Sequence, residues 1–336
     1  MKAKEAIMTL TLPTKPSLFS KRAEYKPFWY PWAYEAFVAS EQMHWLVREI
    51  PMTEDVRTWR SVLTDQERHL LTHIFRFFTQ ADVDVASGYI DRYLPTFKPT
   101  EIRMAMASIA AREGVHIQAY STLIDELGIP EVEYSAFMSY KEMVDKHEYL
   151  FSRREGLSEL EHLALDIAVF SAFGEGLQLF SSFVMLLNFT RFGKMTGMGQ
   201  VVSWSIRDET LHVEFMVQVY HQLLAEHPQL RTAEHSERVR EVAARMVELE
   251  FAFIDLAYAT GANHGLEAED VKQYMRFTAD QRLGQLGERP LFGVDRNPLG
   301  WVDAIVFGKE HTNFFENRAT DYSKGAMTGT WDNAFD

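Results

Sequence analysis

Four glutamate–histidine pairs in this sequence have a spacing that could bind metal. The pattern Glu-x-x-His occurs at Glu41/His44, Glu113/His116, Glu159/His162 and Glu209/His212. Residues three apart on a helix share one face, so each pair could supply a carboxylate oxygen and an imidazole nitrogen to one ion. The chain has 12 histidines, so a single match of this kind is weak evidence by itself.

Two of these pairs have structural explanations. The segment S-E-L-E at 158–161 is a capping box, in which acidic side chains favour the positive end of a helix dipole. We therefore expect Glu159/His162 to be structural and solvated. No carboxylate lies 30 to 35 residues before Glu41, whereas one does for the remaining two pairs. Glu41/His44 is therefore not expected to bind metal.

The remaining two pairs lie in apolar helical stretches, where an unpaired carboxylate would be costly. Each also follows a lone acid on an earlier helix. Asp82 precedes Glu113 by 31 residues, and Glu175 precedes Glu209 by 34. Two helix pairs with the same ligand pattern predict a pseudo-symmetric four-helix bundle, in which four carboxylates and two imidazoles hold two divalent ions. The four negative charges would offset the four positive charges of the ions.

Asp84 is an alternative to Asp82 as the acidic ligand of the first helix pair. The two side chains lie about 200° apart around a helix, so only one of them can point into the bundle. Oxygen-rich ligands with one imidazole per ion suit iron or manganese better than zinc or copper. The pattern therefore predicts two iron or manganese ions.

The helices that carry these ligands are predicted from hydrophobic periodicity and cap signals. The segments at 64–67 (T-D-Q-E) and 158–161 are capping boxes, and Gly128 followed by Pro130 marks a helix end. Glycines at 193, 197 and 199 predict a turn or weak helix. Predicted helices cover about 31–48, 64–94, 100–128, 131–150, 158–190, 201–227, 232–260 and 267–285.

No convincing strand pattern is present, so we expect an all-α fold. Residues 1–30 are expected to form an N-terminal arm, 31–287 a helical domain and 288–336 a flexible C-terminal tail.

Composition narrows the kinds of partner. The chain has 336 residues, 46% hydrophobic and 24% charged, which suits a folded globular protein. Its net charge of −14 argues against nucleic acid or an anionic membrane as the main partner. The absence of cysteine rules out disulfides, a cysteine nucleophile and a thiolate metal site. The N-terminus lacks a secretory pattern, so we expect the protein in the cytoplasm.

The most apolar stretch, 163–189, could be taken for a membrane span. Asp166 and Glu175 interrupt it, and the charge-free run from Gly176 to Thr190 is too short to cross a bilayer. We interpret the stretch as a helix buried on all sides in a soluble bundle. Glu175 must then have a positive partner, because an unpaired buried carboxylate is costly.

These features resemble the small, radical-generating subunit of class I ribonucleotide reductase. The resemblance runs from about Trp45 to the tail and rests on the stretches FTQAD, EGVHIQAY, FGEGLQLFSSF, SIRDETLH and NFFENRATDYSKG. It implies a ferritin-like four-helix bundle core with additional helices, and it favours Asp82 over Asp84. It also implies two ligand groups bridged by Glu113 and Glu209. These are Asp82, Glu113 and His116 for one ion and Glu175, Glu209 and His212 for the other.

The resemblance also implies that Tyr120 is oxidised to a stable radical. Helix geometry agrees with this role, since Tyr120 lies seven residues after Glu113 and four after His116 and therefore shares their face. An apolar wall around the phenol would shield the radical. The expected wall residues are Phe78, Leu179 and Phe183.

Asp208 immediately precedes Glu209 and so points about 100° away from it around the helix. A carboxylate there can accept a hydrogen bond from the outer nitrogen of a ligating histidine. The resemblance implies that His116, Asp208 and Trp45 form a hydrogen-bonded relay towards the surface.

In the tail, the resemblance implies that Tyr322 relays the electron hole to the large subunit, on which the last residues dock. Trp331 and Phe335 would be apolar anchors for this docking. Ribose reduction in this enzyme class uses cysteines of the large subunit. A chain without cysteine therefore cannot be the nucleotide-reducing component.

The function implied is ribonucleotide reduction, in which dioxygen or a derivative at the dimetal site oxidises Tyr120. Iron is the first expectation, and manganese or a mixed manganese–iron pair also suits the ligands. The resemblance further implies a homodimer, and a flavodoxin-like activator is compatible with it. Two alternatives are another ferritin-like dimetal oxidase or oxygenase and a non-catalytic iron-binding protein. The oxidase would need neither Tyr322 nor a docking tail, and an iron-storage protein would be a shorter chain that needs no tyrosine beside the ligands.

Overall fold

The computed structural model describes residues 15–306, apart from residues 260 and 262. Within these residues every regular element is helical and no strand is present, as predicted. The longer helices are α1 (Pro31–Gln42), α3 (Asp65–Ser87), α5 (Thr100–Leu127), α7 (Lys141–Phe151), α8 (Glu159–Ile167), α9 (Phe180–Arg191), α10 (Thr196–Glu226), α11 (Ala233–Tyr258) and α12 (Ala268–Leu286).

Shorter elements connect the longer ones. The short α-helices are α2 (Thr53–Ser61), α4 (Leu94–Thr96), α6 (Val132–Ser135) and α13 (Gly300–Val306). The 3-10 turns are η1 (Val47–Glu49), η3 (Ala136–Ser139) and η5 (Pro228–Leu230). Two segments, η2 (Gly88–Tyr93) and η4 (Ala168–Gln178), have the wider π-helical turn.

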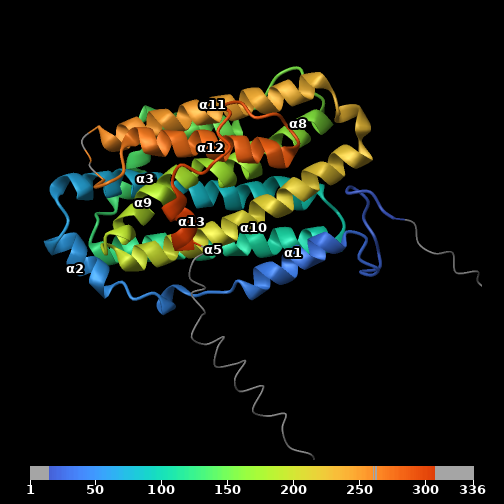
Figure 1. The fold of residues 1–336 in the computed structure, drawn as a ribbon. Coiled ribbons are helices and arrows are strands. Elements are labelled where there is room, and N and C mark those ends of the chain that lie inside the picture. Colours follow the sequence, from blue (N-terminus) through green and yellow to red (C-terminus); the bar gives the residue numbers. More distant parts are fainter. Residues whose placement is uncertain (1–14, 260, 262, 307–336) are drawn as a thin grey trace, which may run out of the picture.

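The longer helices lie side by side, roughly along one direction (Figure 1). Helix α3 packs along α5, while α10 packs along η4 and α9 and also contacts α5. These elements form a four-helix bundle. Helices α11 and α12 pack on each other and cover η4, and α1 covers α5. The fold is therefore the predicted ferritin-like bundle with additional helices.

Both predicted capping boxes are confirmed. At the start of α3, Thr64 Oγ1 accepts from the Glu67 N–H at 3.2 Å, and Thr64 N–H donates to Glu67 Oε2 at 2.8 Å. Ser158 and Glu161 make the same pair of bonds at the start of α8. Gly128 ends α5 with a φ of 73°, a left-handed conformation that glycine adopts without strain.

The start of α10 differs from the prediction of a turn or weak helix. The helix already begins at Thr196 and includes Gly197 and Gly199. The buried Asp55 carboxylate accepts from Gly197 N–H at 3.0 Å and from Met198 N–H at 2.6 Å, which caps the helix from a distant segment. A Cβ on Gly197 would lie 2.8 Å from the carbonyl oxygen of Pro51. Glycine is present for this close approach.

Two predicted helices are shorter than expected. The helix predicted at 31–48 ends at Gln42, because the chain turns inward to bury Trp45. The helix predicted at 131–150 is broken into α6, η3 and α7, with an extended residue at Tyr140. Neither break moves a predicted metal ligand.

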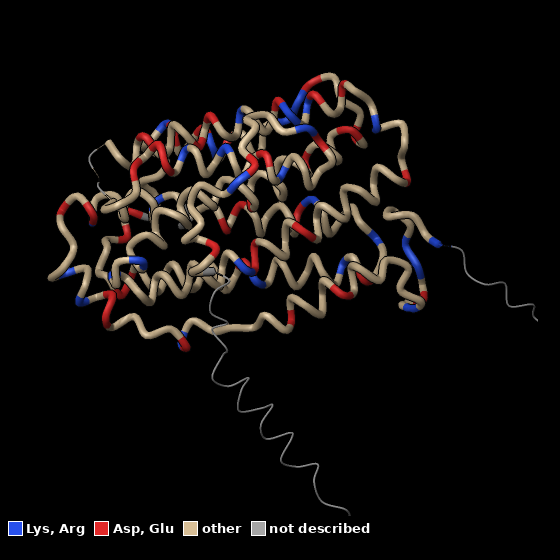
Figure 2. The backbone as a smooth tube through the Cα atoms, in the orientation of Figure 1, with Lys and Arg blue, Asp and Glu red and all other residues tan. Residues whose placement is uncertain are grey.

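Within the described residues, one helical stretch, Glu159–Arg191, is long and apolar enough to cross a membrane. Its most apolar window is 89% buried inside the protein, as expected for a core helix. Acidic and basic residues are intermixed along the outer helices α11 and α12 (Figure 2). The interpretation of 163–189 as a buried helix therefore holds.

Candidate metal centre

Four elements of the bundle bring the predicted ligands together. Asp82 lies on α3, Glu113 and His116 on α5, Glu175 on η4, and Glu209 and His212 on α10. All six side chains are buried, none more than 2% exposed. Burial of four carboxylates in one place is unfavourable unless cations or protons compensate them.

The six side chains form two overlapping groups whose candidate ligand atoms lie within 4.8 Å of one another. Glu113 and Glu209 belong to both groups. The groups are Asp82, Glu113, His116 and Glu209, and Glu113, Glu175, Glu209 and His212. This is the geometry expected for two ions bridged by two shared carboxylates.

Both imidazoles direct Nδ1 into the cage. His116 Nδ1 lies 3.2 Å from Glu113 Oε2 and 3.3 Å from Glu209 Oε1. His212 Nδ1 lies 3.0 Å from Glu113 Oε1 and 3.3 Å from Glu175 Oε2. Each nitrogen therefore faces carboxylate oxygens from two or more helices.

The donor atoms fit a pair of divalent ions. Several buried polar atoms of the cage make no hydrogen bond, namely Asp82 Oδ2, Glu113 Oε1, both Glu209 oxygens and His212 Nδ1. Buried polar atoms normally have partners, and these face a shared interior. Oxygen-rich donors with one imidazole per ion suit iron or manganese.

Without cations, protons compensate the buried charge. Burial raises the pKa of Glu175 to about 7 and raises the pKa of Asp82 well above its usual range. Burial would lower the pKa of His116 and His212, but the surrounding carboxylates outweigh it and raise both well above normal. Ion binding would displace these protons, because ligating imidazoles must be free of a proton at the binding nitrogen.

Tyr120 is buried on α5, on the face that carries Glu113 and His116. Its hydroxyl donates to Ser205 Oγ at 3.2 Å. Burial, together with the Asp82 carboxylate, raises the pKa of Tyr120 far above its ordinary value, so the phenol keeps its proton. Leu179 and Phe183 are buried in the same hydrophobic cluster as Tyr120.

Asp208 joins the cage to Trp45. One of its oxygens, Oδ2, accepts from Trp45 Nε1 at 2.8 Å and lies 3.2 Å from His116 Nε2. The rings of Trp45 and His116 stack with centroids 6.0 Å apart. The structure therefore places His116, Asp208 and Trp45 in one continuous contact chain.

The discounted residues lie outside the cage. Asp84 accepts from Gln80 and pairs with His147, so it points away from the other ligands. Glu41 accepts from Ser108, and Glu159 pairs with Arg153. Tyr322, Trp331 and Phe335 lie outside the described residues, as does the side chain of Phe78.

Several contacts of the cage were missed from the sequence. Tyr89 donates to Glu175 at 3.0 Å, Ser205 accepts from Tyr120, and the Trp204 ring lies 5.2 Å from that of Trp45. One signal was available. Tyr89 follows Asp82 by seven residues, the same interval that separates Tyr120 from Glu113.

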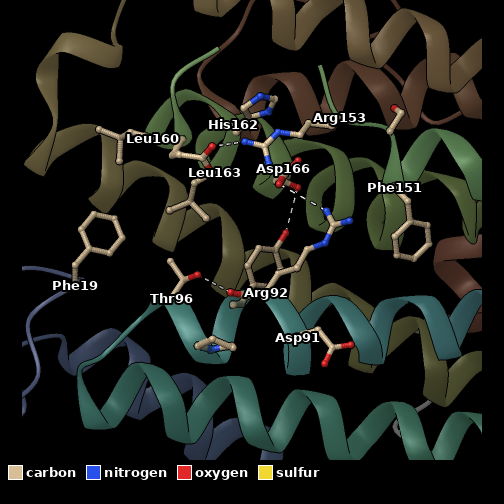
Figure 3. Close-up of a pocket in the computed structure, with 14 residues that line it drawn as sticks. Phe19, Asp91, Arg92, Thr96, Phe151, Arg153, Leu160, His162, Leu163 and Asp166 are labelled. Atoms are coloured by element: carbon tan, nitrogen blue, oxygen red, sulfur yellow. Dashed lines mark hydrogen bonds and ion pairs between the residues drawn. The ribbon is translucent and has the colours of Figure 1, made fainter. Parts of the chain in front are cut away.

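The structure also contains a cavity of about 680 Å³. Figure 3 shows the residues that line it. It is lined by the ends of η2 and α7 and by α8, and Arg92 faces Asp166 across it at 3.6 Å. None of the six cage residues lines it. The metal centre is thus an interior site rather than the floor of this cavity.

Fold and site together define a ferritin-like dimetal-carboxylate protein. Residues 22–298 match the model of the family described as "Ribonucleotide reductase, small chain". The chain belongs to this family, as its sequence motifs suggested.

Known proteins support this placement. The chain is 44% identical over 330 residues to a protein of Invertebrate iridescent virus 3 named "Probable ribonucleoside-diphosphate reductase small subunit 048L", covering 94% of this chain and 88% of that protein. A ribonucleotide reductase R2 subunit from Clostridium botulinum has a similar fold, with a TM-score of 0.76 and 21% identity over 82% of this chain and 88% of that chain. A dimanganese(II)-NrdF from Streptococcus sanguinis gives a TM-score of 0.71 and 21% identity, covering 82% and 95%.

Proposed function

We propose that this protein generates and stores the radical used by a class I ribonucleotide reductase. The observation that carries the proposal is a buried phenol, Tyr120, beside a cage of four carboxylates and two imidazoles. In this proposal the large subunit uses the stored oxidant to reduce ribonucleotides to deoxyribonucleotides.

The six cage residues would hold two ions, with Glu113 and Glu209 bridging. Asp82 and His116 complete one ligand set, and Glu175 and His212 complete the other. When bound, the ions supply the electrons that reduce dioxygen, or a derivative of it, and so create the oxidising power. Iron is the first choice. Manganese or a mixed pair suits the same donors, and the relative from Streptococcus sanguinis is described as dimanganese(II).

Tyr120 would give one electron and its phenolic proton to the dioxygen-derived oxidant at the dimetal site. Because its pKa is raised by burial, the phenol is neutral before oxidation and must release its proton as it loses the electron. The apolar side chains of Leu179 and Phe183 exclude water from this region. Exclusion of water protects a reactive intermediate from side reactions.

The hole would leave the interior through Asp208 and Trp45. These two side chains and His116 are already joined by contacts of 2.8 and 3.2 Å at one carboxylate oxygen. Tyr322 in the tail would be the next carrier, and the tail would dock on the large subunit through Trp331 and Phe335. Asp208 would accept from the N–H groups of both Trp45 and His116, which would hold the two rings in a fixed relative position.

The remaining proposals concern organisation and partners. We propose an arm at 1–30, a dimetal helical domain at 31–287 and a docking tail at 288–336. A homodimer in the cytoplasm, with a flavodoxin-like activator as an additional partner, fits the family. The net charge of −14 supports the expectation that neither nucleic acid nor an anionic membrane is a partner.

Tyr120→Phe tests the radical role. We expect the loaded variant to bind both ions and to show no tyrosyl radical by electron paramagnetic resonance. Ribonucleotide reduction with the large subunit should fall more than about 10³-fold, because the storing group is gone. The matched control is Tyr220→Phe, since Tyr220 is equally buried but bonds His235 instead of facing the cage.

Full nucleotide reduction by Tyr120→Phe would show that the storage role is wrong. A second arm removes the last ten residues and measures capture of the large subunit. Unchanged capture would favour a different ferritin-like oxidase, which needs no docking tail.

A further inference from the structure

The segment that carries Glu175 is unusual. Segment η4 keeps the wide π-helical turn over Ala168–Gln178, and every one of its residues is buried. Wide turns of this kind are rare, mostly short, and frequent at functional sites. Groups around the segment must therefore favour a backbone that a helix does not adopt by default.

One such group is Arg282 of α12. Its Nε donates to the carbonyl oxygen of Gly176 at 2.9 Å, and its guanidinium lies 5.2 Å from the Phe180 ring centroid. A Cβ at position 176 would lie only 2.6 Å from Arg282 Nε. The approach of the guanidinium to the backbone directly after Glu175 therefore depends on glycine at 176.

The second group is a fully buried ion pair between Lys146 of α7 and Glu250 of α11. Lys146 Nζ donates to the carbonyl oxygen of Gln178 at 3.5 Å and lies 3.6 Å from the Phe77 ring centroid. Glu250 accepts a hydrogen bond from Ser181, just after the segment. The ion pair therefore contacts the chain on both sides of the junction between η4 and α9, at Gln178 through Lys146 and at Ser181 through Glu250.

Stability alone does not explain these buried charges. A buried ion pair is often no more stabilising than apolar residues of similar size, because each charge loses its hydration. A hydrogen bond from a charged donor to a carbonyl oxygen is stronger than one between neutral groups. Two cations from two helices meet carbonyls within three residues of Glu175, and this points to a geometric role.

We propose that Arg282 and the Lys146–Glu250 pair are positioning residues for the metal ligand Glu175. They hold the wide-turned segment so that the Glu175 carboxylate faces His212, while Tyr89 bonds the same carboxylate from η2. The inference rests on the dimetal centre of the proposed function, and it does not depend on the tyrosyl radical.

The main test replaces the pair with apolar residues, as Lys146→Met/Glu250→Met. Because both charges are removed together, no unpaired buried charge remains and the variant is expected to fold. Mn²⁺ titration, followed by the paramagnetic resonance of the free ion, counts bound ions and their affinities. We expect the ion on the Glu175 side to bind about 10- to 100-fold more weakly, with the other ion unchanged.

To identify which ion is affected, the double substitution is combined with the loss of one histidine ligand at a time. His116→Ala leaves the Glu175 ligand group intact, so the double substitution should weaken the ion that remains. His212→Ala leaves the Asp82 group, so the same substitution should have no effect there. A merely structural role would not show this difference between sides.

Arg282→Met provides an independent arm, with Arg282→Lys as the conservative rescue that retains a donor and a charge. We expect Met to weaken the Glu175-side ion and Lys to restore part of the affinity. The matched control is Arg276→Met on the same helix, because Arg276 pairs with the exposed Glu269 and not with η4.

Unchanged affinity on both sides in the double variant and in Arg282→Met would overturn the inference and leave the proposed function intact. Equal weakening on both sides would also overturn it, since that indicates general damage. If the unaltered protein binds no Mn²⁺, the dimetal centre of the proposed function fails as well.

Discussion

At the scale of single residues, the cage depends on where His116 places its two nitrogens. Nδ1 faces the carboxylates, and Nε2 faces Asp208 at 3.2 Å. If Nδ1 binds an ion as proposed, Nε2 would carry the proton and donate to Asp208, which would orient the ring. Asp208 also accepts from Trp45, so one carboxylate oxygen contacts both His116 and Trp45.

Asp208→Asn should separate these two roles. The amide oxygen could still accept from both rings, but it carries no charge, so both hydrogen bonds would be weaker than those to the carboxylate. We expect Mn²⁺ affinity on the His116 side to fall about 10-fold. With ions at saturation, the Tyr120 radical should still form, while nucleotide reduction with the large subunit should fall more than about 100-fold.

The control is Asp255→Asn, a surface carboxylate of α11 that pairs with Lys272. Nucleotide reduction by Asp208→Asn at the level of this control would exclude Asp208 from the transfer chain.

At the scale of elements, the start of α3 is tied to the start of α10. Glu67 closes the capping box with Thr64, and its other oxygen pairs with Lys194, just before α10. These two helices carry Asp82 and Glu209. A local cap signal therefore also helps to set the relative position of two ligand helices.

Glu67→Gln should weaken this tie in a pH-dependent manner. Burial alone would raise the pKa of Glu67, but Lys194 and the Thr64 N–H outweigh it and hold the pKa below its ordinary value of 4.5. A carboxyl group whose pKa is lowered by folding stabilises the folded state fully at pH values above its ordinary pKa. This stabilisation is lost as pH falls through the folded-state pKa. We expect the metal-free variant to lose about 1–2 kcal/mol at pH 7 by urea unfolding, and progressively less as pH falls below 4.5.

Glu54→Gln is the comparison variant, because Glu54 forms an exposed pair with Arg57 at the start of α2. Its change should stay below about 0.5 kcal/mol. A pH-independent loss in Glu67→Gln would contradict the electrostatic part of the argument.

At the scale of the whole molecule, the two ions would join α3, α5, η4 and α10 at one point. Each ligand group draws on more than two of these elements, and Glu113 and Glu209 are common to both. Metal binding should therefore stabilise the bundle as a unit. Without the ions, the buried carboxylates would depend on protons for compensation, because burial raises the pKa of Asp82 and of Glu175.

Mn²⁺ added to metal-free protein should raise the midpoint of thermal unfolding. An ion that binds only the folded chain contributes about 2.7 kcal/mol per site at a concentration of 100 times its Kd. Glu209→Gln should lose most of this increment, because Glu209 belongs to both groups. Glu214→Gln, an exposed residue of the same helix, should retain it, and equal increments in the two variants would refute the shared-ligand arrangement.

The sequence alone was sufficient for the all-α fold, both capping boxes and the helical elements that carry the six ligands, because these depend on spacing along a helix. Asp82 and Asp84 show the limit of such reasoning, since periodicity shows that they point apart but not which one faces the core.

Only the tertiary structure decided the contacts between helices. Tyr89 against Glu175, Trp45 against Asp208 and Lys146 against Glu250 each join segments distant in sequence, whose register is set by packing. The wide turn of η4 likewise reflects its surroundings, because the cations that contact its carbonyls come from α7 and α12. The hydrophobic periodicity and the composition of a segment do not show which distant segment it contacts.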